Sequence, residues 1–272
     1  MFAHAIDIAS RFTFPFVTLR RDTAGRISTS VAAFIVVNDA GWVLTSGHVV
    51  DQILSDGVES PEPSGDGEPD GSSRIVERSE IWALPGFSAT PARMVEARVN
   101  RLADLGLCRL EPFDSGAIGA FPVFRDPASP IAQGMSVCRL GFPFYDVEAV
   151  FDEKTQGFML SSDAFPIPRF ALDGIVARFN RRAAEDGSVS ALFIETSTPG
   201  LRGQSGGPLV DVDGRVCGIQ SYTSHLDLGF DAHYQIDSEL VIERQFLNVG
   251  AATHVAEVHA LLGEAGVAYS RG

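Results

Sequence analysis

Short runs of β-branched and aromatic residues recur along the whole chain, and turn residues separate them. Such runs are typical of β-strands, whereas the spacing of apolar side chains that indicates a helix is scarce. Many short strands with few helices favour a β-barrel or a β-sandwich, so we predict an all-β protein. The runs lie at 12–19, 30–37, 42–46, 74–84, 92–99, 104–110, 135–142, 191–197, 207–212 and 215–222.

Two connections between these runs carry tight-turn signals. Residues 38–41, Asn-Asp-Ala-Gly, separate the second run from the third and predict a hairpin. Residues 211–214, Asp-Val-Asp-Gly, predict another tight turn, where the run 207–212 ends and the run 215–222 begins.

One helix is predicted near the C-terminus, at 253–263. Four apolar residues of this segment fall on one helical face, with Thr253 as a suitable N-cap and Gly263 as a suitable C-terminal stop. The pattern predicts an amphipathic helix docked on the β-structure. The four apolar residues are Val255, Val258, Leu261 and Leu262.

Chain length, net charge and the N-terminal segment limit the classes of protein to which the chain can belong. A chain of 272 residues can form one large domain or two compact lobes. Its net charge of -14 argues against nucleic acid or a membrane surface as partner, because both are anionic. The N-terminal segment has neither the cationic region nor the long apolar stretch of a secretory signal, so we expect a cytoplasmic protein.

Residues 55–73 differ from the rest of the chain. They hold six acidic residues and three prolines but no lysine or arginine, and cannot bury enough apolar surface to order themselves. We predict an acidic, disordered surface loop, with a linker between domains as the alternative.

Three cysteines, Cys108, Cys138 and Cys217, each lie singly within an apolar segment. An odd number leaves no complete disulfide framework, and no clustered Cys or His spacing indicates a metal site. We therefore expect three buried free thiols in a reducing compartment, and neither a metal nor a cofactor.

The stretch RGQSGGPLV at 202–210 places one serine among three glycines. It is either a glycine-rich turn that leads into a strand or a loop that presents Ser205 as a nucleophile. A serine hydroxyl is a poor nucleophile at neutral pH unless a base accepts its proton and a third group orients that base. The choice therefore depends on the rest of the chain.

His48 is the candidate base among six histidines. It follows the strand-like run 42–46, and we expect it to emerge from the strand end into a short turn. A buried histidine bonded to a nearby carbonyl is the alternative. His254 and His259 lie on or beside the polar side of the predicted helix, and we expect both to be solvated.

Asp104 is the candidate acid, because it opens the largely apolar run 104–110. A carboxylate at the margin of a core is costly unless it is hydrogen-bonded, and this cost favours a functional role for Asp104. A turn residue at the start of a strand is the alternative.

Together, the segments TSGHVV, DLGLCRL and GQSGGPLV, in the order His, Asp, Ser, resemble the chymotrypsin-like (trypsin-like) serine protease family. The pattern is closest to bacterial intracellular trypsin-like peptidases. The resemblance implies two six-stranded antiparallel β-barrels with the active site in the cleft between them. Residues 1–117 would form the N-terminal barrel, 118–250 the C-terminal barrel, and 251–272 a C-terminal helix and tail.

The resemblance also implies a role for each site residue. Ser205 would attack the scissile carbonyl, His48 would take and return the proton, and Asp104 would orient the imidazole. The backbone amides of Gly203 and Ser205 would form the oxyanion hole. Gln204 stands where zymogen-activated relatives carry an aspartate, so activation by insertion of a cut N-terminus is not expected.

Substrate-binding residues follow from the same resemblance. Pro199, six residues before the nucleophile, would lie at the bottom of the primary pocket, and without an acid there a preference for Arg or Lys loses its basis. Ser221, Tyr222 and Thr223 would form the pocket wall and pair with the substrate backbone by β-augmentation. Tyr222 and Thr223 would narrow the pocket toward small or medium apolar side chains, or serve ordinary strand packing.

We therefore predict a serine endopeptidase that hydrolyses protein or peptide substrates through an acyl-enzyme. The alternative from another class is a protease-fold binding or regulatory module with a latent triad, which engages a regulatory protein partner through the acidic loop. An esterase is disfavoured, because GQSGGP before a strand is not the GxSxG elbow between strand and helix.

Overall fold

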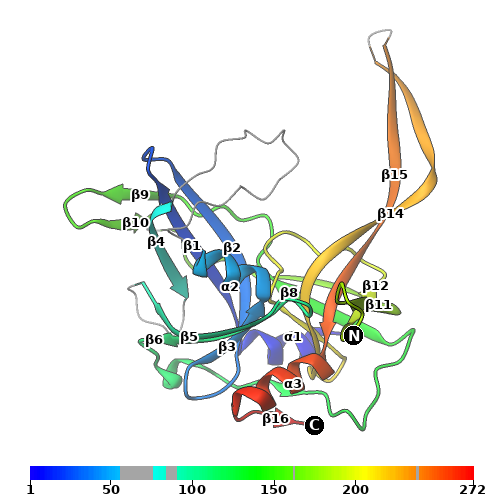
Figure 1. Ribbon diagram of the computed structural model, residues 1–272, viewed down its shortest axis with the longest axis horizontal. Helices are drawn as coiled ribbons and strands as arrows, with labels where there is room; N and C mark the ends of the chain where they lie inside the picture. The colour runs from blue at the N-terminus through cyan, green and yellow to red at the C-terminus, as the bar shows by residue number, and fades with distance from the viewer. Residues whose placement is uncertain (56–75, 84–90, 162, 237–238) are drawn as a thin grey trace.

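The chain folds into two large β-sheets, one from each half of the sequence, with helices at their margins (Figure 1). The acidic loop expected at 55–73 lies, from residue 56 onward, outside the described residues. The computed structural model describes residues 1–55, 76–83, 91–161, 163–236 and 239–272.

The first sheet has six strands in the order β4-β1-β2-β3-β6-β5, and all neighbours are antiparallel. A further bridge joins Ile81 of β4 to Ala92, just before β5, so the sheet curls until its two edges approach each other. The strands are β1 (Thr13–Asp22), β2 (Ile27–Val36), β3 (Trp42–Ser46), β4 (Val76–Ala83), β5 (Arg93–Asn100) and β6 (Leu105–Glu111).

The second large sheet has eight strands in the order β13-β8-β11-β12-β15-β14-β7-β16. Strand β13 also pairs with β14, so this sheet curls as well, and β7 pairs in parallel with β14 and β16. Strands β9 (Ala149–Asp152) and β10 (Gly157–Leu160) form a separate hairpin. The strands of the large sheet are β7 (Val123–Phe124), β8 (Ser136–Gly141), β11 (Phe170–Ala183), β12 (Ser190–Thr196), β13 (Pro208–Val210), β14 (Val216–Ile236), β15 (Glu239–His254) and β16 (Ser270–Arg271).

Each predicted run contains a strand, and both predicted turns are present. Gly41 and Gly214, which end the two turns, have φ values of +80° and +81°, where glycine carries no steric penalty. The fold is therefore mostly β, with curled sheets and a C-terminal helix. Two six-stranded antiparallel barrels stay a prediction, because the second sheet has eight strands and includes parallel pairs.

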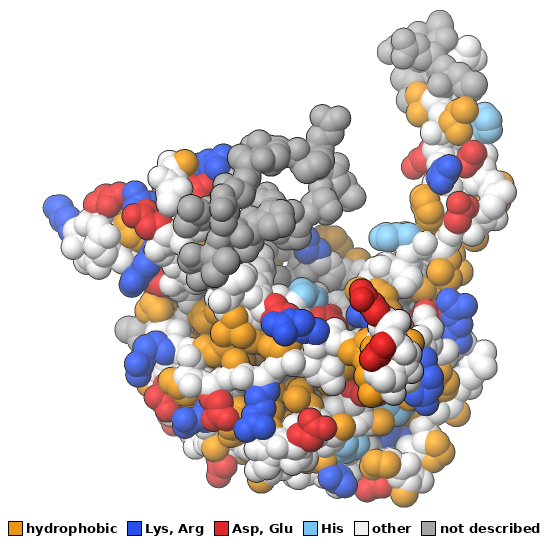
Figure 2. Space-filling view, in the orientation of Figure 1, with side chains coloured by type: hydrophobic (Ala, Val, Ile, Leu, Met, Phe, Trp, Pro, Cys, Tyr) orange, Lys and Arg blue, Asp and Glu red, His pale blue; other side chains and the backbone are white. Residues whose placement is uncertain are grey.

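Strands β14 and β15 extend far beyond the body of the protein as a hairpin arm (Figures 1 and 2). The predicted run 215–222 covers only the start of β14. Apolar residues alternate from Leu226 to Ile236, which is typical of a strand, and this signal was missed. The arm exposes the apolar side chains of Leu228, Phe230, Tyr234, Val241, Ile242, Phe246 and Leu247.

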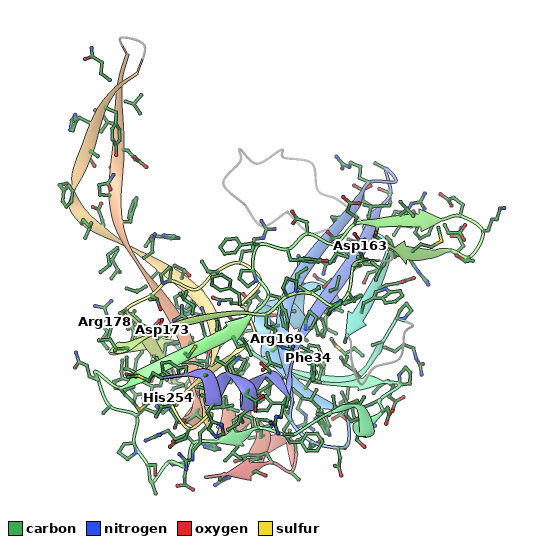
Figure 3. The ribbon with its side chains drawn as sticks, turned by 180° about the vertical axis from the view of Figure 1, so that it is seen from behind. Phe34, Asp163, Arg169, Asp173, Arg178 and His254 are labelled. Atoms are coloured by element: carbon green, nitrogen blue, oxygen red, sulfur yellow. The ribbon has the colours of Figure 1, made fainter. Side chains whose placement is uncertain are left out.

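Three α-helices lie in the described part of the chain: α1 (Ala3–Ser10), α2 (Gly47–Leu54) and α3 (Val255–Ala265). Seen from behind, α1 lies close to Arg169, whose guanidinium donates to the Ser10 carbonyl at 3.0 Å (Figure 3). Helix α3 confirms the predicted C-terminal helix, and its apolar face is buried as expected.

The caps of α3 differ from the prediction. His254 is the N-cap in place of Thr253, and its Nδ1 accepts a hydrogen bond from Ala256 N at 3.0 Å. Gly266, with a φ of +67°, ends the helix in place of Gly263. The sequence therefore located the helix correctly but not its capping residues.

The expectation of a solvated side chain is wrong for His259, whereas His254 is half-buried. His259 is 9% exposed, and its two ring nitrogens lie 3.0 Å from the Tyr269 hydroxyl and 3.0 Å from the Arg125 carbonyl. Burial is the main cause that lowers the pKa of His254 to about 4. Both rings belong to the packed C-terminal region.

The prediction of buried free thiols is confirmed. Cys108, Cys138 and Cys217 are free and buried. Burial raises the pKa of Cys108 and of Cys217 to about 12, which leaves these thiols protonated and unreactive at neutral pH.

Hydrogen bonds join the first sheet to the second half of the chain. Ala33 N of β2 donates to Ser205 O at 2.8 Å, and the Ser46 hydroxyl at the end of β3 donates to Gln220 O at 2.8 Å. Gly206 has a φ of +83°, and a Cβ there would lie 2.2 Å from Ala33 O. The loop around Gly206 therefore packs directly against the backbone of the first sheet.

Gly206→Ala is expected to destabilise the protein by about 3 kcal/mol, because the added methyl overlaps the Ala33 carbonyl and the positive φ disfavours a side chain. Gly263→Ala on the exposed side of α3, where a Cβ meets nothing within 4 Å, is the control and should stabilise by about 0.5–1 kcal/mol. Urea denaturation followed by circular dichroism measures both. Similar effects of the two substitutions would contradict the close packing at Gly206.

Candidate active site

The loop at 202–207 presents Ser205 between the two sheets. Gly203 has a φ of +93°, and a Cβ there would lie 2.5 Å from the Phe142 carbonyl oxygen, so only glycine fits. Among the hydrogen bonds of the described residues, none is donated by the amide of Gly203 or of Ser205. Two backbone donors beside the Ser205 hydroxyl are therefore without an acceptor in the described part of the chain.

Gln204 holds this loop from within. Its side chain is fully buried, and its Oε1 accepts a hydrogen bond from Leu201 N at 2.9 Å. The backbone amide of Gln204 donates to Leu201 O at 2.9 Å, and Phe142 N donates to Gly203 O at 2.9 Å. A neutral side chain and backbone bonds thus stabilise the loop without an ion pair.

His48 is the second residue of α2, so the predicted short turn after the strand is wrong. The chain passes from β3 into α2 because Gly47 fits closely against the segment that precedes β6. Gly47 N donates to Asp104 O at 2.9 Å, and a Cβ at Gly47 would lie 3.0 Å from Leu105 N. The His48 side chain is 51% exposed and lies over Asp104.

Asp104 precedes β6 and accepts three hydrogen bonds through its carboxylate. The donors are His48 N at 2.8 Å, His48 Nδ1 at 2.9 Å and the Ser221 hydroxyl. Burial raises the pKa of Asp104, but the hydrogen bonds and charge of His48 and the bond from Ser221 outweigh burial, so its pKa lies below the ordinary value. Asp104 also has a left-handed φ of +49°, a conformation that costs about 1–2 kcal/mol.

The structure pairs His48 with Asp104 and places Ser205 beside Ser221. The Ser205 hydroxyl donates to Ser221 O at 3.4 Å, and the hydroxyl of the same Ser221 binds Asp104. No hydrogen bond within the described residues joins His48 to Ser205. Catalytic hydrogen bonds are often long or poorly aligned when no substrate is bound.

The residues expected to bind substrate lie on two facing segments. Thr223 of β14 donates through its hydroxyl to Gly200 O at 2.6 Å, and the Pro199 carbonyl accepts a hydrogen bond from Arg139. Beyond Gln220, no strand in the described ranges pairs with the outer edge of β14. This edge is therefore free to pair with an extended peptide.

Tyr222 has a packing role. Its ring lies 5.5 Å from the Phe193 ring, and the Arg182 guanidinium lies 4.8 Å from the Tyr222 ring centroid. Of the two interpretations of this side chain, the contacts favour ordinary strand packing.

Sequence reasoning missed two contacts near the site. Binding of substrate by Ser221 stays a prediction, and the contact of its hydroxyl with Asp104 was missed because no local pattern marks it. Arg139 was missed, although one signal pointed to it, namely a single charged residue within the apolar run 135–142.

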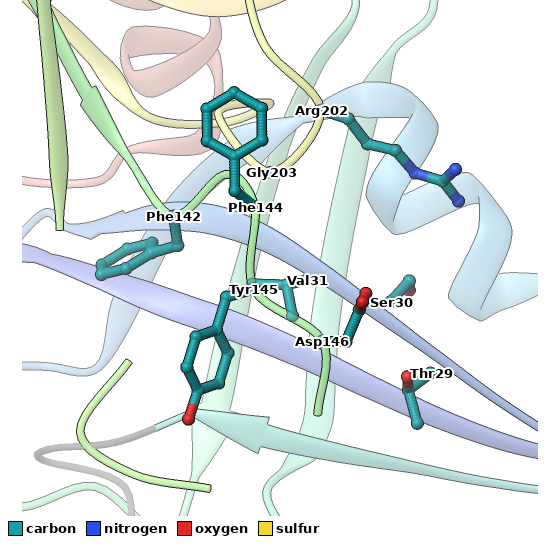
Figure 4. Close-up of a pocket in the computed structure, with 9 residues that line it drawn as sticks. All are labelled: Thr29, Ser30, Val31, Phe142, Phe144, Tyr145, Asp146, Arg202 and Gly203. Atoms are coloured by element: carbon teal, nitrogen blue, oxygen red, sulfur yellow. The ribbon is translucent and has the colours of Figure 1, made fainter. Parts of the chain in front are cut away.

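A cavity of about 360 Å³ adjoins the loop at Gly203 (Figure 4). It lies between β2 and the segment that follows β8, with the rings of Phe142 and Tyr145 on one side and the Arg202 guanidinium on the other. Pro199 does not line it. The remaining lining residues are Thr29, Ser30, Val31, Phe144 and Asp146.

No cluster of three or more His, Cys, Asp and Glu residues within the described ranges is arranged to hold a metal ion. None of the helices described combines the length and the apolar character needed to cross a membrane.

Solved structures share this fold. The Rv3671c protease from M. tuberculosis, in its active form, matches with a TM-score of 0.52 and 14% identity over 98% of this chain and 86% of that chain. The HtrA-type protease AlgW, with a tripeptide, matches with a TM-score of 0.52 and 16% identity over 98% of this chain and 65% of that chain. No curated sequence matches the chain.

Residues 32–219 match the family model of the trypsin-like peptidase domain. The matched range covers more than half of the chain and contains the segments of His48, Asp104 and Ser205. The protein therefore belongs to the trypsin-like peptidase family.

Proposed function

We propose that this protein is a serine endopeptidase in which Ser205, His48 and Asp104 form the catalytic triad. The observation that carries the proposal is the Asp104 carboxylate, which accepts hydrogen bonds from His48 Nδ1 and from the Ser221 hydroxyl. Ser221 in turn accepts the hydrogen bond of the Ser205 hydroxyl. This arrangement orients a base and holds the Ser205 hydroxyl on the residue that binds the same carboxylate.

In the proposed reaction, Ser205 Oγ attacks the scissile carbonyl carbon while His48 Nε2 accepts the hydroxyl proton. Collapse of the tetrahedral intermediate breaks the peptide bond, and His48 gives its proton to the leaving amine. Water then attacks the acyl-enzyme, with His48 again taking and returning a proton. Asp104 keeps the proton of neutral His48 on Nδ1 and stabilises the imidazolium.

The amides of Gly203 and Ser205 stabilise the oxyanion in this proposal. Each lacks a protein acceptor among the described residues; one is the amide of the nucleophile itself, and the other lies two residues before it. Removal of one such donor typically costs roughly 3–4 kcal/mol of transition-state stabilisation.

The substrate chain is proposed to pair with the free edge of β14 at Ser221–Thr223, on the acyl side of the scissile bond. The leaving-group side then extends past Gly203 toward the cavity of about 360 Å³, where Phe142 and Tyr145 offer apolar contacts and Arg202 a positive charge. An extended peptide on a sheet edge gains affinity from backbone bonds and specificity from pockets.

Gln204 supports activation by a route other than N-terminal insertion. Its buried amide side chain bonds to Leu201 N, within its own loop, and it carries no charge to pair with an ammonium group. The loop is therefore built without a cleavage-dependent ion pair.

A regulatory module with a latent triad is the second candidate function. The observation that favours it is the Thr223 hydroxyl bound to Gly200 O, together with the lack of a hydrogen bond between His48 and Ser205 among the described residues. The two candidates differ in whether Ser205 reacts in the isolated protein.

A fluorophosphonate probe is expected to label the purified protein at Ser205, with mass spectrometry locating the adduct. Ser205→Ala should abolish labelling, and His48→Ala should slow it by a factor of up to about 10⁶, because the base that activates the hydroxyl is lost. Ser129→Ala, which removes an exposed hydroxyl far from the loop in sequence, is the control and should leave the rate unchanged. No labelling of the folded protein would favour the latent module.

Asp104→Asn is expected to lower the free energy of unfolding by about 1–3 kcal/mol at pH 7. The folded pKa of Asp104 is lowered, so the ionised carboxylate stabilises the fold above its unfolded pKa of about 3.9. That contribution is lost as the pH falls through the folded pKa. The difference between wild type and Asp104→Asn should therefore narrow in acid, as measured by urea denaturation from pH 7 to pH 3.

Asp39→Asn is the matched control for this measurement. Asp39 is exposed, and its side chain makes no hydrogen bond in the part of the chain that the structure describes. The substitution should change the free energy of unfolding little at any pH. A difference for Asp104→Asn that stays constant from pH 7 to pH 3 would contradict a lowered pKa at Asp104.

A further inference from the structure

Arg139 of β8 is the largest fully buried side chain among the described residues. Its guanidinium donates to Thr198 O at 3.0 Å, to the Pro199 carbonyl and to the Thr196 hydroxyl. Its Nε has no hydrogen-bond partner among the residues that the structure describes. A guanidinium has five N–H donors, so this buried group retains hydrogen-bonding capacity.

The charge of Arg139 lacks a counter-ion within the described ranges. Its three acceptors are two carbonyls and a hydroxyl, and no carboxylate described lies within ion-pair distance. Burial lowers the pKa of Arg139 to about 10, so the group is still a cation at neutral pH. Buried charges are normally paired, as Arg125 is with Asp211 at 2.6 Å.

Arg139 lies under the two segments expected to hold the residue before the scissile bond. One segment contains Pro199, whose carbonyl the guanidinium binds. The other is β14, where Thr223 pairs with Gly250 of β15, and Gly250 lies against the guanidinium. Thr223 follows two residues after Ser221, which accepts the hydrogen bond of the nucleophile.

Gly250 makes room for this cation. A Cβ at Gly250 would lie 2.4 Å from Nη1 and 2.6 Å from Nη2 of Arg139. Gly250 also faces both Thr223 and Thr196 across the sheet. Any side chain at this position would push the guanidinium away from the pocket segments, so Arg139 and Gly250 form one fitted unit.

We propose that Arg139 forms a cationic floor for the primary specificity pocket, so that the enzyme selects an acidic side chain, and glutamate above aspartate, immediately before the scissile bond. This inference rests on the proposed function. A substrate carboxylate supplies the counter-ion that Arg139 lacks, and the planar guanidinium suits a carboxylate in two-point contact. Glutamate reaches further than aspartate by one methylene, toward a floor beneath Pro199 and Thr223.

Two side chains of β14 fill the space beside Gly200. The Thr223 hydroxyl donates to Gly200 O at 2.6 Å, and a Cβ at Gly200 would lie 2.2 Å from Gln220 Nε2, which donates to Tyr222 O at 3.0 Å. In this proposal, a change of the Thr223 rotamer and a shift of the Gln220 amide open the way to Arg139 and turn the Thr223 hydroxyl toward the incoming carboxylate. The β14–β15 pairing stays intact, because only side-chain bonds are exchanged.

The first experiment measures kcat/KM of the full chain on tetrapeptide amides that differ only in the residue before the scissile bond. We expect glutamate to exceed its neutral isostere glutamine by at least about tenfold, with aspartate between them and leucine and arginine below. Arg139→Met keeps an apolar side chain of similar length and should bring the Glu/Gln ratio close to one.

Arg178→Met is the control for a general change of charge. Arg178 forms an ion pair with Glu195 and extends from β11 (Figure 3), and its loss removes the same charge without touching the pocket segments. The Glu/Gln ratio of Arg178→Met should equal that of the wild type. If Arg139→Met does not fold, as judged by circular dichroism, the wild-type Glu/Gln ratio decides.

A second experiment separates specificity from catalysis. Fluorescence anisotropy measures the binding of labelled peptides that end in glutamate or in glutamine to Ser205→Ala protein, which cannot turn over. We expect at least about tenfold tighter binding of the glutamate peptide, and we expect Ser205→Ala combined with Arg139→Met to lose that difference.

The outcomes distinguish the two proposals. Cleavage of the glutamine, leucine or arginine peptides as fast as the glutamate peptide would overturn the cationic floor and leave the endopeptidase. Glutamate-selective binding without cleavage or labelling of Ser205 would support the floor and contradict the endopeptidase. Equal binding of both peptides without cleavage would overturn both.

Discussion

The carboxylate of Asp104 connects three parts of the fold through hydrogen bonds to one side chain. It precedes β6 of the first sheet, accepts two hydrogen bonds from His48 of α2, and accepts a third from Ser221 of β14 in the second sheet. These bonds offset the cost of its left-handed backbone and of its burial. The contacts that align the site are therefore also contacts that hold the two sheets together.

Local patterns made much of this fold predictable from the sequence. Apolar runs with turn residues between them located the strands. His48 stood out because it follows such a run, Asp104 because it opens one, and Ser205 because it lies in a glycine cluster. The start of α2 was not predictable, since it depends on how closely Gly47 fits the backbone that precedes β6. The burial of His259 was not predictable either, because its partners Tyr269 and Arg125 are not neighbours in the sequence.

Local sequence patterns do not predict which side chains surround Pro199. Pro199 is found by counting back from Ser205, but the charge beneath it belongs to Arg139, a residue 60 positions earlier on a different strand. The room for that charge comes from Gly250, on a third strand. A motif centred on the nucleophile contains none of this information, because pocket chemistry is set by which strands become neighbours in the sheet.

Strand β14 is continuous from the walls of the site into the projecting arm. The pairs from Thr223–Gly250 to Asp227–Phe246 run without a shift in register, so the inner part of the arm shares one alignment with the pairing of Thr223 and Gly250. A slip of one residue within that stretch would turn its side chains to the opposite face. The register shifts between Asp227 and Asp231, so the outer part of the arm is aligned separately. A change in the length of the outer part can therefore be absorbed at this irregularity without altering how Thr223 meets Gly250.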